Sequence, residues 1–443
     1  MKKIFVLSLG CSRNLVDSEV LSGQLEKAGF CLSESAEDAD IAIVNTCGFI
    51  ADAKKESIDC ILQLAEMKKS GKISRLLVTG CLAQRYSSEL FDEIKEIDAV
   101  FGSSDFSEIP LFLAGDPSAK RKKKVSSSPG YLYDHNSPRN IFTPGHFAYV
   151  KIQEGCSNRC SYCVIPSLKG SRRSRELKSV VSEVKALKKK YGIKEAVLVG
   201  QDTTSFGFDA PGGEDISDLI REVSAVMDDG WVRLLYTHPA HFTDRLIKTI
   251  STTPNVCRYV DIPIQHVNDT ILDRMNRKVT KKDIQSLIDR IRLGIDGVVL
   301  RTSVILGFPG ETEKRFRELF DFISEVKFER LGAFVYSREE GTPAFNFSGQ
   351  VPEKVKKERF SRIMEIQQTI SAEKNDSLIG RVLEVLIDEP DAAENGIFKG
   401  RSYMDAPEVD GTVYVRGKDL KPGEFVNVKI SSAAEYDLKG DVV

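Results

Sequence analysis

A chain of 443 residues is longer than a single hydrophobic core usually organises, so we expect two or three domains. A formal net charge of −2 gives no overall electrostatic reason to expect a nucleic-acid-binding protein, and DNA is not expected as a partner. No apolar stretch is long enough to span a bilayer, and nine cysteines are too few for a disulfide scaffold in a chain of this size. The sequence therefore favours an enzyme of the reducing cytoplasm with no membrane partner.

Residues 1–110 repeat a unit in which a short apolar run is followed by a helical pattern. Parallel strands are expected at residues 4–9, 41–45, 75–79 and 98–102. Helices are expected at residues 14–28, 51–69 and 84–95. This alternation predicts a small doubly wound α/β domain.

One cysteine follows each of the first three predicted strands, at Cys11, Cys47 and Cys81. Because parallel strands share one C-terminal edge, these three side chains can converge although they are far apart in sequence. Helix N-termini at that edge favour the thiolate, which is the form that ligates iron. Free cysteines are also common as small buried residues, but the positional repeat favours a three-cysteine iron–sulfur site.

Residues 111–141 are rich in Gly, Pro, Ser and charged residues, and this composition predicts an exposed linker or loop. The segment contains five consecutive basic residues, from Lys120 to Lys124. Such a run is usually a solvated tether, although it could contact RNA. The sequence alone leaves both interpretations open.

Residues 142–375 alternate strands and helices over a longer stretch. The candidate strands are residues 147–153, 196–200, 232–236, 259–262, 298–306 and 332–336. Six such units predict a partial (β/α)6 barrel rather than a closed eight-fold barrel. A polar helical pattern from Pro352 to Leu378 is interpreted as a connector to the last segment.

The first strand of this barrel ends at a loop in which Cys156, Cys160 and Cys163 form a C-x3-C-x2-C pattern. Three thiolates this close cannot all pair as disulfides, but they can hold three corners of a 4Fe–4S cluster. The fourth iron would then have no protein ligand and could chelate S-adenosylmethionine. A structural zinc site would want a fourth Cys or His nearby, and none follows within about fifty residues.

Chemistry in barrels of this kind takes place at the C-terminal ends of the strands. Glycines there permit close backbone approach to a ligand, and polar side chains can fix amino, carboxylate and ribose groups. The candidate S-adenosylmethionine-binding residues are Tyr162, Gly200, Gln201, Asp202, Gln265 and Gly307. No catalytic side chain is predicted beyond the cysteine ligands.

Three histidines lie near these strand ends, at His238, His241 and His266. The His-Pro-Ala-His segment could suggest a metal site, but no carboxylate or third ligand is arranged beside it in the sequence. The histidines are therefore interpreted as site-lining or structural side chains.

Residues 376–443 carry short alternating runs at 382–387, 413–416 and 425–430, which predict a small antiparallel β-barrel. This segment contains fourteen Asp and Glu residues against eight Lys and Arg residues, a balance of −6. An acidic barrel repels phosphates and would suit a basic protein partner.

Nearly end to end, the chain resembles the methylthiotransferases of the radical S-adenosylmethionine superfamily. In these proteins a cluster domain is followed by a TIM-like radical SAM barrel and a small β-barrel called a TRAM domain. The segments most similar to the RimO-type branch are SLGCSRNLVDSE at 8–19, NTCGF at 45–49, GQDTT at 200–204 and YDLKG at 436–440. One departure is Ser12-Arg13, which stands where Pro-Lys is usual.

The resemblance implies a transferase that adds a methylthio group to the β-carbon of an aspartate in the twelfth protein of the small ribosomal subunit. It implies two 4Fe–4S clusters, with S-adenosylmethionine as both radical source and methyl donor. The cluster on Cys156, Cys160 and Cys163 would generate the radical, and the cluster on Cys11, Cys47 and Cys81 would hold the sulfur. The implied partners are this basic ribosomal protein and an electron donor such as flavodoxin or ferredoxin.

Two other functions are weighed against this one. The sister branch modifies adenosine in transfer RNA; there the Asp-Thr-Thr segment typically reads Asn-Val-Asn, and a basic C-terminal domain would be expected. A non-catalytic iron–sulfur electron carrier or RNA-binding module would need neither a barrel with strand-end loops nor an open iron.

Overall fold

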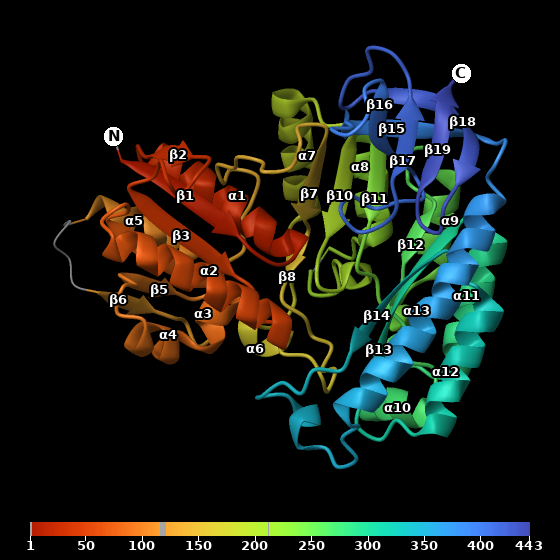
Figure 1. Ribbon diagram of the computed structural model, residues 1–443, viewed down its shortest axis with the longest axis horizontal. Helices are drawn as coiled ribbons and strands as arrows, with labels where there is room; N and C mark the ends of the chain where they lie inside the picture. Colours follow the sequence, from red (N-terminus) through yellow and green to blue (C-terminus); the bar gives the residue numbers. More distant parts are fainter. Residues whose placement is uncertain (1, 116–120, 211) are drawn as a thin grey trace.

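The computed structural model describes residues 2–115, 121–210 and 212–443. Figure 1 shows an N-terminal α/β part in red and orange, a central α/β part in green, and a closed β-barrel in blue. Among the described residues, no helix combines the length and the apolar character that a membrane crossing requires. The expected architecture of an α/β domain, a partial barrel and a small β-barrel is confirmed.

The N-terminal part is a parallel sheet with the strand order β2-β1-β3-β4-β5-β6. Its strands are β1 (Lys3–Ser8), β2 (Cys31–Ser33), β3 (Ile41–Thr46), β4 (Arg75–Gly80), β5 (Ala99–Phe101) and β6 (Lys122–Lys124). Its helices are α1 (Ser12–Lys27), α2 (Ala51–Lys69), α3 (Cys81–Arg85), α4 (Ser87–Glu93) and α5 (Ile109–Ala114), with a 3-10 turn, η1 (Phe106–Glu108).

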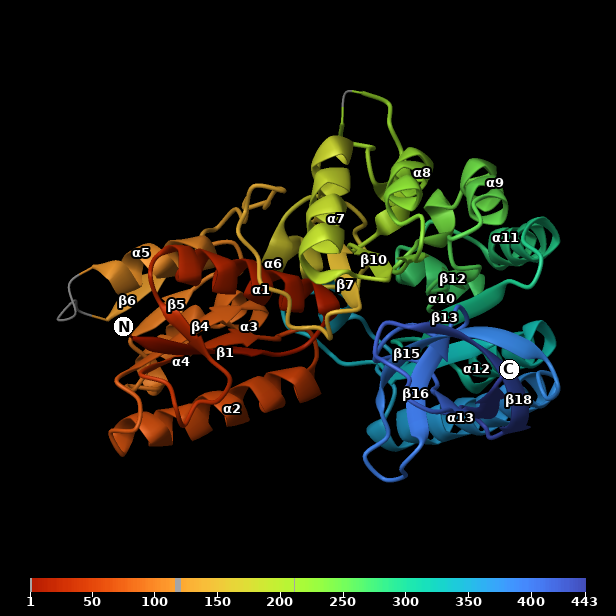
Figure 2. The same cartoon turned by 90° about the horizontal axis from the view of Figure 1, so that it is seen from above.

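Both faces of this sheet are covered, which explains the nearly continuous apolar runs of its strands. In β3, Ile41 and Ile43 belong to the core that includes α1 and α5, whereas Ala42 and Val44 pack with α2 and α3. Figure 2 shows the sheet between α1 and α5 on one side and α2 on the other.

The expected linker at residues 111–141 is wrong in part. Its first residues belong to α5, and Lys122–Lys124 forms the edge strand β6, whose backbone pairs with β5. A run of lysines is a poor strand former, but an edge strand leaves its side chains in solvent, and Lys122 and Lys124 lie 3.8 and 3.6 Å from Glu108. Lys120 lies outside the described residues.

The central part contains six parallel strands arranged as two three-stranded sheets, β11-β10-β7 and β12-β13-β14. They are β7 (Phe147–Lys151), β10 (Glu195–Val199), β11 (Trp231–Leu234), β12 (Tyr259–Asp261), β13 (Val299–Leu306) and β14 (Arg330–Val335). The hairpin pair β8 (Gln153–Glu154) and β9 (Arg173–Ser174) lies beside the end of β7. All six predicted barrel strands are therefore present.

Helices alternate with these strands, as the partial barrel requires. They are α6 (Ile165–Lys169), α7 (Leu177–Tyr191), α8 (Ile216–Val226), α9 (Asp244–Thr252), α10 (Asp269–Arg274), α11 (Lys281–Gly294) and α12 (Glu313–Val326). Short 3-10 turns are η2 (Thr203–Ser205), η3 (Pro239–His241) and η4 (Pro343–Asn346). The predicted connector is the long helix α13 (Glu353–Asp376), which packs on β14.

The C-terminal part is a closed barrel in the order β15-β16-β17-β19-β18. Its strands are β15 (Val382–Pro390), β16 (Ile397–Ser402), β17 (Val413–Arg416), β18 (Phe425–Ala433) and β19 (Leu438–Val442). The expectation of a fully antiparallel barrel is corrected at one pair, because β17 and β19 run parallel. A closed ring with an odd number of strands cannot alternate direction throughout, so one parallel pair is unavoidable.

The C-terminal barrel is joined by buried charges to the N-terminal ends of the central strands. Arg401 of β16 donates to Glu195 at the start of β10 (2.6 Å), and Arg330 at the start of β14 donates to Asp405 (2.6 Å). His146 contacts Asp388 in the same way (2.7 Å). The opposite, C-terminal ends of the strands therefore remain for the N-terminal part and the cysteine loops.

Several of the acidic residues in 376–443 are bound at this interface and are not available to a partner. Asp388, Asp405 and Asp410 are engaged with side chains of the central part, and Glu408 accepts a hydrogen bond from Tyr149 (3.0 Å). Part of the acidic excess is internal, so the sequence count overstates the negative charge that the barrel presents to a partner.

Candidate active site

Cys11, Cys47 and Cys81 are brought together at the C-terminal edge of the N-terminal sheet. Cys11 caps the N-terminus of α1, and Cys81 is the first residue of α3. A Cβ atom added to Gly10 would lie 2.8 Å from the sulfur of Cys47, so the turn after β1 lies directly against the turn after β3. A Cβ atom added to Gly48, the residue after Cys47, would lie 3.0 Å from the Cys81 carbonyl carbon, so the three turns meet as the shared strand edge predicts.

The local sequence explains this geometry. Gly10 and Gly80 precede two of the cysteines and have φ angles of +89° and +96°, a region in which a side chain is strained. Ser57 of α2 holds the Cys47 backbone, because its hydroxyl accepts from the Cys47 amide (3.0 Å) and donates to the Cys47 carbonyl (2.9 Å).

The surroundings of the three thiols differ electrostatically. Burial alone would raise the pKa of Cys11, but Arg13 and Lys169 outweigh it and the net shift is downward. Burial raises the pKa of Cys47, and it raises the pKa of Cys81 to about 12. Without a cation bound to them, Cys47 and Cys81 are thus protonated thiols, whereas Cys11 is the most acidic of the three.

The second triplet lies on the loop that joins β8 to α6. The loop is fixed by backbone hydrogen bonds from Cys156 to the Gly170 carbonyl (3.1 Å) and from Cys163 to the Cys160 carbonyl (3.1 Å). Arg277, which is 4% exposed, donates to the Cys160 sulfur at 3.7 Å. Burial raises the pKa of Cys156 to about 11 and that of Cys163 to about 12.

Arg13 connects the two triplets. Its Nη1 atom donates to the Gly200 carbonyl at the end of β10 (3.0 Å), and its guanidinium carbon lies 4.6 Å from the centre of the Tyr236 ring. The same cation opposes the burial that raises the pKa of Cys156 and of Cys163. A residue of the N-terminal part therefore reaches into the mouth of the central barrel.

A buried ion network lies beside this contact. The ammonium of Lys151 contacts Asp17 of α1 and Glu154 (2.6 Å), and Lys169 contacts Asp17 (2.9 Å). Gln201 donates to Glu154 at 2.5 Å. Because buried charges are stable only when paired, this network fixes the N-terminal part against the cysteine loop.

Two of the candidate S-adenosylmethionine-binding residues are held by the cysteine loop itself. The Oδ2 atom of Asp202 accepts from Asn158 (2.7 Å) and from His241 (2.7 Å), and Gln201 leaves its side-chain oxygen buried without a partner. Burial would raise the pKa of Asp202, but the hydrogen bonds that it accepts from His241 and Thr204 help to lower it to about 2, so the carboxylate is ionised.

The other candidates have different surroundings. Tyr162 is half-buried, with its ring edge-on to Phe308, and Gln265 has a φ angle of +67° between its backbone bonds to β13. The space in front of Gly307 is filled by the Lys356 stem, and its amide donates to Glu311 (3.0 Å). The close approach that Gly307 permits is therefore made by α13, which differs from its expected role toward a ligand.

The histidine interpretation needs one correction. Asp202 supplies the carboxylate that is missing near His238 and His241 in the sequence, and the ligand atoms of these three residues lie within 4.8 Å of one another. His238 is kept neutral, because burial and nearby Arg277 lower its pKa to about 2. His266 is structural, since its Nδ1 accepts from two backbone amides.

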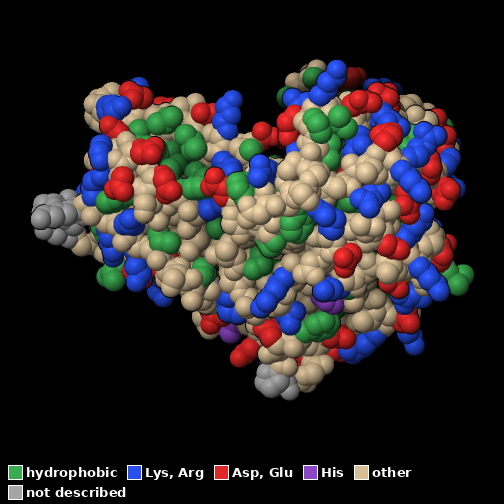
Figure 3. All heavy atoms as spheres, turned by 90° about the horizontal axis from the view of Figure 1, so that it is seen from below, with side chains coloured by type: hydrophobic (Ala, Val, Ile, Leu, Met, Phe, Trp, Pro, Cys, Tyr) green, Lys and Arg blue, Asp and Glu red, His purple; other side chains and the backbone are tan. Residues whose placement is uncertain are grey.

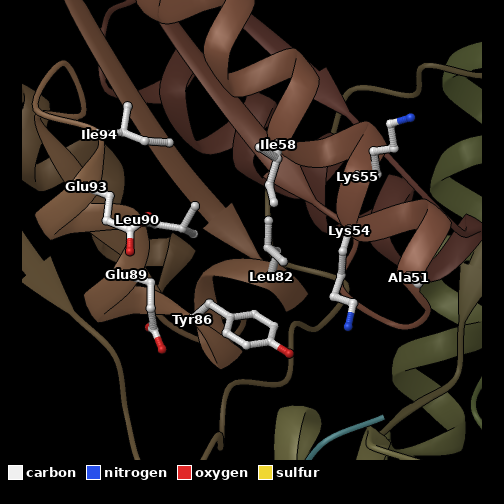
Figure 4. Close-up of a pocket in the computed structure, with 10 residues that line it drawn as sticks. All are labelled: Ala51, Lys54, Lys55, Ile58, Leu82, Tyr86, Glu89, Leu90, Glu93 and Ile94. Carbon is white, nitrogen blue, oxygen red and sulfur yellow. The ribbon is translucent and has the colours of Figure 1, made fainter. Parts of the chain in front are cut away.

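A cavity of about 470 Å³ lies elsewhere, between α2 and the α3–α4 segment. Figure 4 shows Ile58, Leu82 and Leu90 on its apolar side, with Tyr86 and the carboxylates of Glu89 and Glu93 at its edge. None of the ten residues that line it is a cysteine. The cavity is therefore separate from the cysteine site.

The sequence did not indicate Arg13, Lys169 or Arg277 as functional residues. Arg277 reaches Cys160 only because the chain after α10 folds back onto the cysteine loop. One local feature could have indicated Arg13. A cation in the first turn of α1 interacts unfavourably with the helix dipole, so helix formation alone does not explain an arginine at this position.

Three family models match successive parts of the chain. Residues 3–102 match the family described as uncharacterized protein family UPF0004, residues 150–323 match the radical SAM superfamily, and residues 379–443 match the TRAM domain. The UPF0004 and radical SAM matches each contain one of the two cysteine triplets.

Among solved structures, the chain is similar to a radical S-adenosylmethionine methyltransferase, TsrM, from Kitasatospora setae. With the form bound to tryptophan and a SAM analogue, the TM-score is 0.56 at 15% identity, covering 92% of this chain and 80% of the other. At this identity the likeness shows the fold alone.

Curated proteins are similar over the full length. The chain is 48% identical to the ribosomal protein uS12 methylthiotransferase RimO of Clostridioides difficile, covering 100% of this chain and 99% of that protein. The identity is 47% to the protein of the same name from Desulforamulus reducens, covering 100% of each. With this identity over the full length of both chains, the chain belongs to the RimO family of ribosomal protein uS12 methylthiotransferases.

Proposed function

We propose that this protein is a radical S-adenosylmethionine methylthiotransferase that transfers a methylthio group to the β-carbon of an aspartate in the ribosomal protein uS12. The observation that carries this proposal is the full-length likeness, at 46–48% identity, to three proteins of that name. The two cysteine triplets support it. A C–H bond with no acidic proton resists acid–base chemistry, so a radical must remove the hydrogen, and an iron–sulfur cluster with S-adenosylmethionine can generate one.

The cysteine surroundings fit iron–sulfur clusters. Each triplet consists of three thiols. Cations lie beside the sulfurs: Arg277 donates to the Cys160 sulfur, and the charges of Arg13 and Lys169 lower the pKa of Cys11. Thiols with raised pKa values become thiolates when iron binds, because the metal charge offsets the cost of burial. We therefore assign one 4Fe–4S cluster to Cys156, Cys160 and Cys163 and a second to Cys11, Cys47 and Cys81.

When bound, the first cluster would supply one-electron cleavage of S-adenosylmethionine and the second would carry the transferred sulfur. This chain's residues provide the binding surface. Tyr162, Gly200, Gln201, Asp202 and Gln265 would hold S-adenosylmethionine, and the ionised Asp202 suits its amino or ribose groups. Gly307 is left out of this set, because Lys356 occupies the space in front of it.

The proposed partners are uS12 and an electron donor such as flavodoxin or ferredoxin, which cluster reduction requires. The substrate assignment rests on the likeness to the RimO relatives and not on the acidic count of residues 376–443, part of which is internal. The second substrate class, adenosine in transfer RNA, is an outcome of the test below.

The test is mass spectrometry of uS12 and of transfer RNA from cells with and without this gene. We expect methylthiolated aspartate in uS12 only when the gene is present, with no change in transfer RNA. Complementation with the Cys156→Ala, Cys160→Ala, Cys163→Ala variant is the matched control and should not restore the modification. An unchanged uS12 together with loss of a methylthio-adenosine would assign the protein to transfer RNA instead.

A further inference from the structure

Arg13 differs from the two lysines of the site in having no carboxylate partner, and it differs from Arg277, which is 4% exposed and donates to Cys160 and to the Pro263 carbonyl, in being only half-buried. Lys151 and Lys169 are both paired with Asp17, and the carboxylate of Glu154 is bound by Lys151 and Gln201. Within the part of the chain that the structure describes, Arg13 makes no ion pair, and its hydrogen bonds go to the Gly200 carbonyl and to Cys11.

A guanidinium carries five N–H donors in a planar fork that matches a carboxylate. Arg13 uses its donors on single acceptors, so the fork keeps unsatisfied N–H groups. The side chain is half-buried, and none of its nitrogens is both fully buried and without a partner. Any nitrogen of Arg13 that lacks a partner therefore keeps some exposure to solvent.

The guanidinium packs on the ring of Tyr236, a residue whose backbone conformation is strained. Tyr236 has a φ angle of +60°, which is strained for a bulky side chain. Its amide donates to Asp261 (2.8 Å), whose carboxylate is paired with Arg301, and its hydroxyl lies 3.4 Å from the Ser12 hydroxyl. Two contacts of Tyr236, one at its backbone and one at its hydroxyl, thus position the ring on which Arg13 stacks.

The position of Arg13 follows the geometry that the proposed reaction needs. The carbon that receives the methylthio group must come within reach of both cysteine triplets. Arg13 follows Cys11 by two residues and reaches the Gly200 carbonyl, next to the Gln201-Asp202 segment whose Asp202 binds Asn158 of the second cysteine loop. In aspartate the β-carbon is bonded directly to the carboxylate carbon. A group that fixes the carboxylate therefore places the reacting carbon within one bond.

We propose that Arg13, stacked on Tyr236, binds the side-chain carboxylate of the substrate aspartate as a bidentate ion pair. This inference rests on the proposed function and adds a substrate-binding residue to it. Arg13 is then the group by which the enzyme distinguishes aspartate from its neutral isostere asparagine.

The test measures the affinity of the reconstituted holoenzyme for uS12 and for uS12 with its target aspartate changed to asparagine. For the unaltered enzyme, we expect the asparagine form to bind roughly ten- to hundred-fold more weakly, the range for hydrogen bonds to a charged group. For Arg13→Met, the two forms should bind equally, and Arg13→Lys should retain part of the preference because it keeps the charge without the fork.

Arg121→Met is the matched control. Arg121 also stacks on an aromatic ring, 4.0 Å from the centre of Phe91, and donates only to backbone carbonyls, but it lies at the far edge of the N-terminal sheet. This variant should keep the full preference for aspartate. Iron content and reductive cleavage of S-adenosylmethionine are measured for every variant, because Arg13 also acts on Cys11, and the preference is compared among variants that retain both.

Each other outcome has a defined meaning. If Arg13→Met keeps the preference for aspartate, the proposal is overturned. If it keeps the preference and loses cleavage of S-adenosylmethionine, the guanidinium serves that molecule's carboxylate instead. If Arg13→Met loses its iron, the proposal is tested with Arg13→Lys and Tyr236→Leu, which both keep a cation at position 13. Tyr236→Leu removes the ring that positions Arg13 and should abolish the preference for aspartate. If the unaltered enzyme neither binds nor modifies uS12, it is the proposed function that fails.

Discussion

At the scale of single residues, the six cysteines form two sets that have different neighbours. Cys156, Cys160 and Cys163 are close together in sequence and lie on one loop. The other three cysteines come from the ends of three strands of one sheet. The cations Arg13, Lys169 and Arg277 lie beside them. The division of labour between the sets can be tested by removing each in turn.

Anaerobically reconstituted protein should bind about eight irons, four for each cluster. Changing Cys156, Cys160 and Cys163 to Ala should leave about half of the iron and abolish cleavage of S-adenosylmethionine. Changing Cys11, Cys47 and Cys81 to Ala should spare cleavage and stop methylthio transfer. Iron analysis and product chromatography measure these effects, and a variant of the first set that keeps all its iron would refute the assignment.

The electrostatic difference within the N-terminal triplet gives a second test. In the metal-free protein, Cys11 has a lowered pKa and Cys81 a pKa of about 12, and both side chains are partly exposed. Because the thiolate is the nucleophile, iodoacetamide should alkylate Cys11 before Cys81 at pH near 8. Replacing Arg13 by Met should raise the pKa of Cys11 and slow its alkylation. Peptide mapping that finds equal rates for Cys11 in the two proteins would contradict this account.

Spacing in the sequence identified both cysteine triplets, because strand ends and short loops constrain where a side chain falls. It could not identify Arg277, which comes to Cys160 through the fold, nor the contact of Asp202 with His238 and His241. The space in front of Gly307 is filled by Lys356 of α13, a helix that begins only at Glu353, and no local sequence pattern predicts such packing.

At the scale of elements, apolar periodicity found every strand of the central barrel and three strands of the C-terminal barrel. It missed β2 and β19, and it missed two further strands: β6, which is three lysines at a sheet edge, and β16, where Lys399, Gly400 and Arg401 interrupt the alternation. Both strands are defined by the backbone of a neighbour and not by their own side chains. Strands of this kind carry little signal in a single sequence.

The strand β16 also carries the side chain that joins two domains. Arg401 donates to Glu195 (2.6 Å) and to both carboxylate oxygens of Asp388 (2.9 Å each), and it is 5% exposed. Replacing Arg401 by Ala leaves buried carboxylates without this partner and should destabilise the interface by about 3–5 kcal/mol. Denaturant unfolding followed by Trp231, which stacks on Phe425 of the C-terminal barrel, measures the loss.

Lys399 provides the control on the same strand. It pairs with the exposed Glu389, and exposed pairs contribute little to stability, so Lys399→Ala should leave the unfolding midpoint essentially unchanged. Equal losses for Arg401→Ala and Lys399→Ala would show that the buried ion network does not hold the two domains together.

At the scale of the whole molecule, charged contacts set the N-terminal part against the central barrel. Arg139 lies between Glu19 of α1 and Glu183 of α7, and Glu339 after β14 accepts from Lys54 (2.8 Å) and Arg85 (2.7 Å). These pairs, together with the Asp17 network, hold the N-terminal part against the central part, including the segments that flank the loop of Cys156, Cys160 and Cys163. The surface itself is mixed in charge: Figure 3 shows acidic and basic side chains interspersed over one face, with a hollow between the N-terminal part and the rest.

A mixed surface gives no electrostatic reason to prefer RNA or a basic protein, so the substrate must be established by the product. The most direct measurement offers the purified, reconstituted enzyme uS12 and transfer RNA together, with S-adenosylmethionine, a sulfur source and a reductant. Mass spectrometry of both substrates should find methylthiolated aspartate in uS12 and unmodified transfer RNA. Methylthio-adenosine in transfer RNA, with the uS12 aspartate unmodified, would contradict the account.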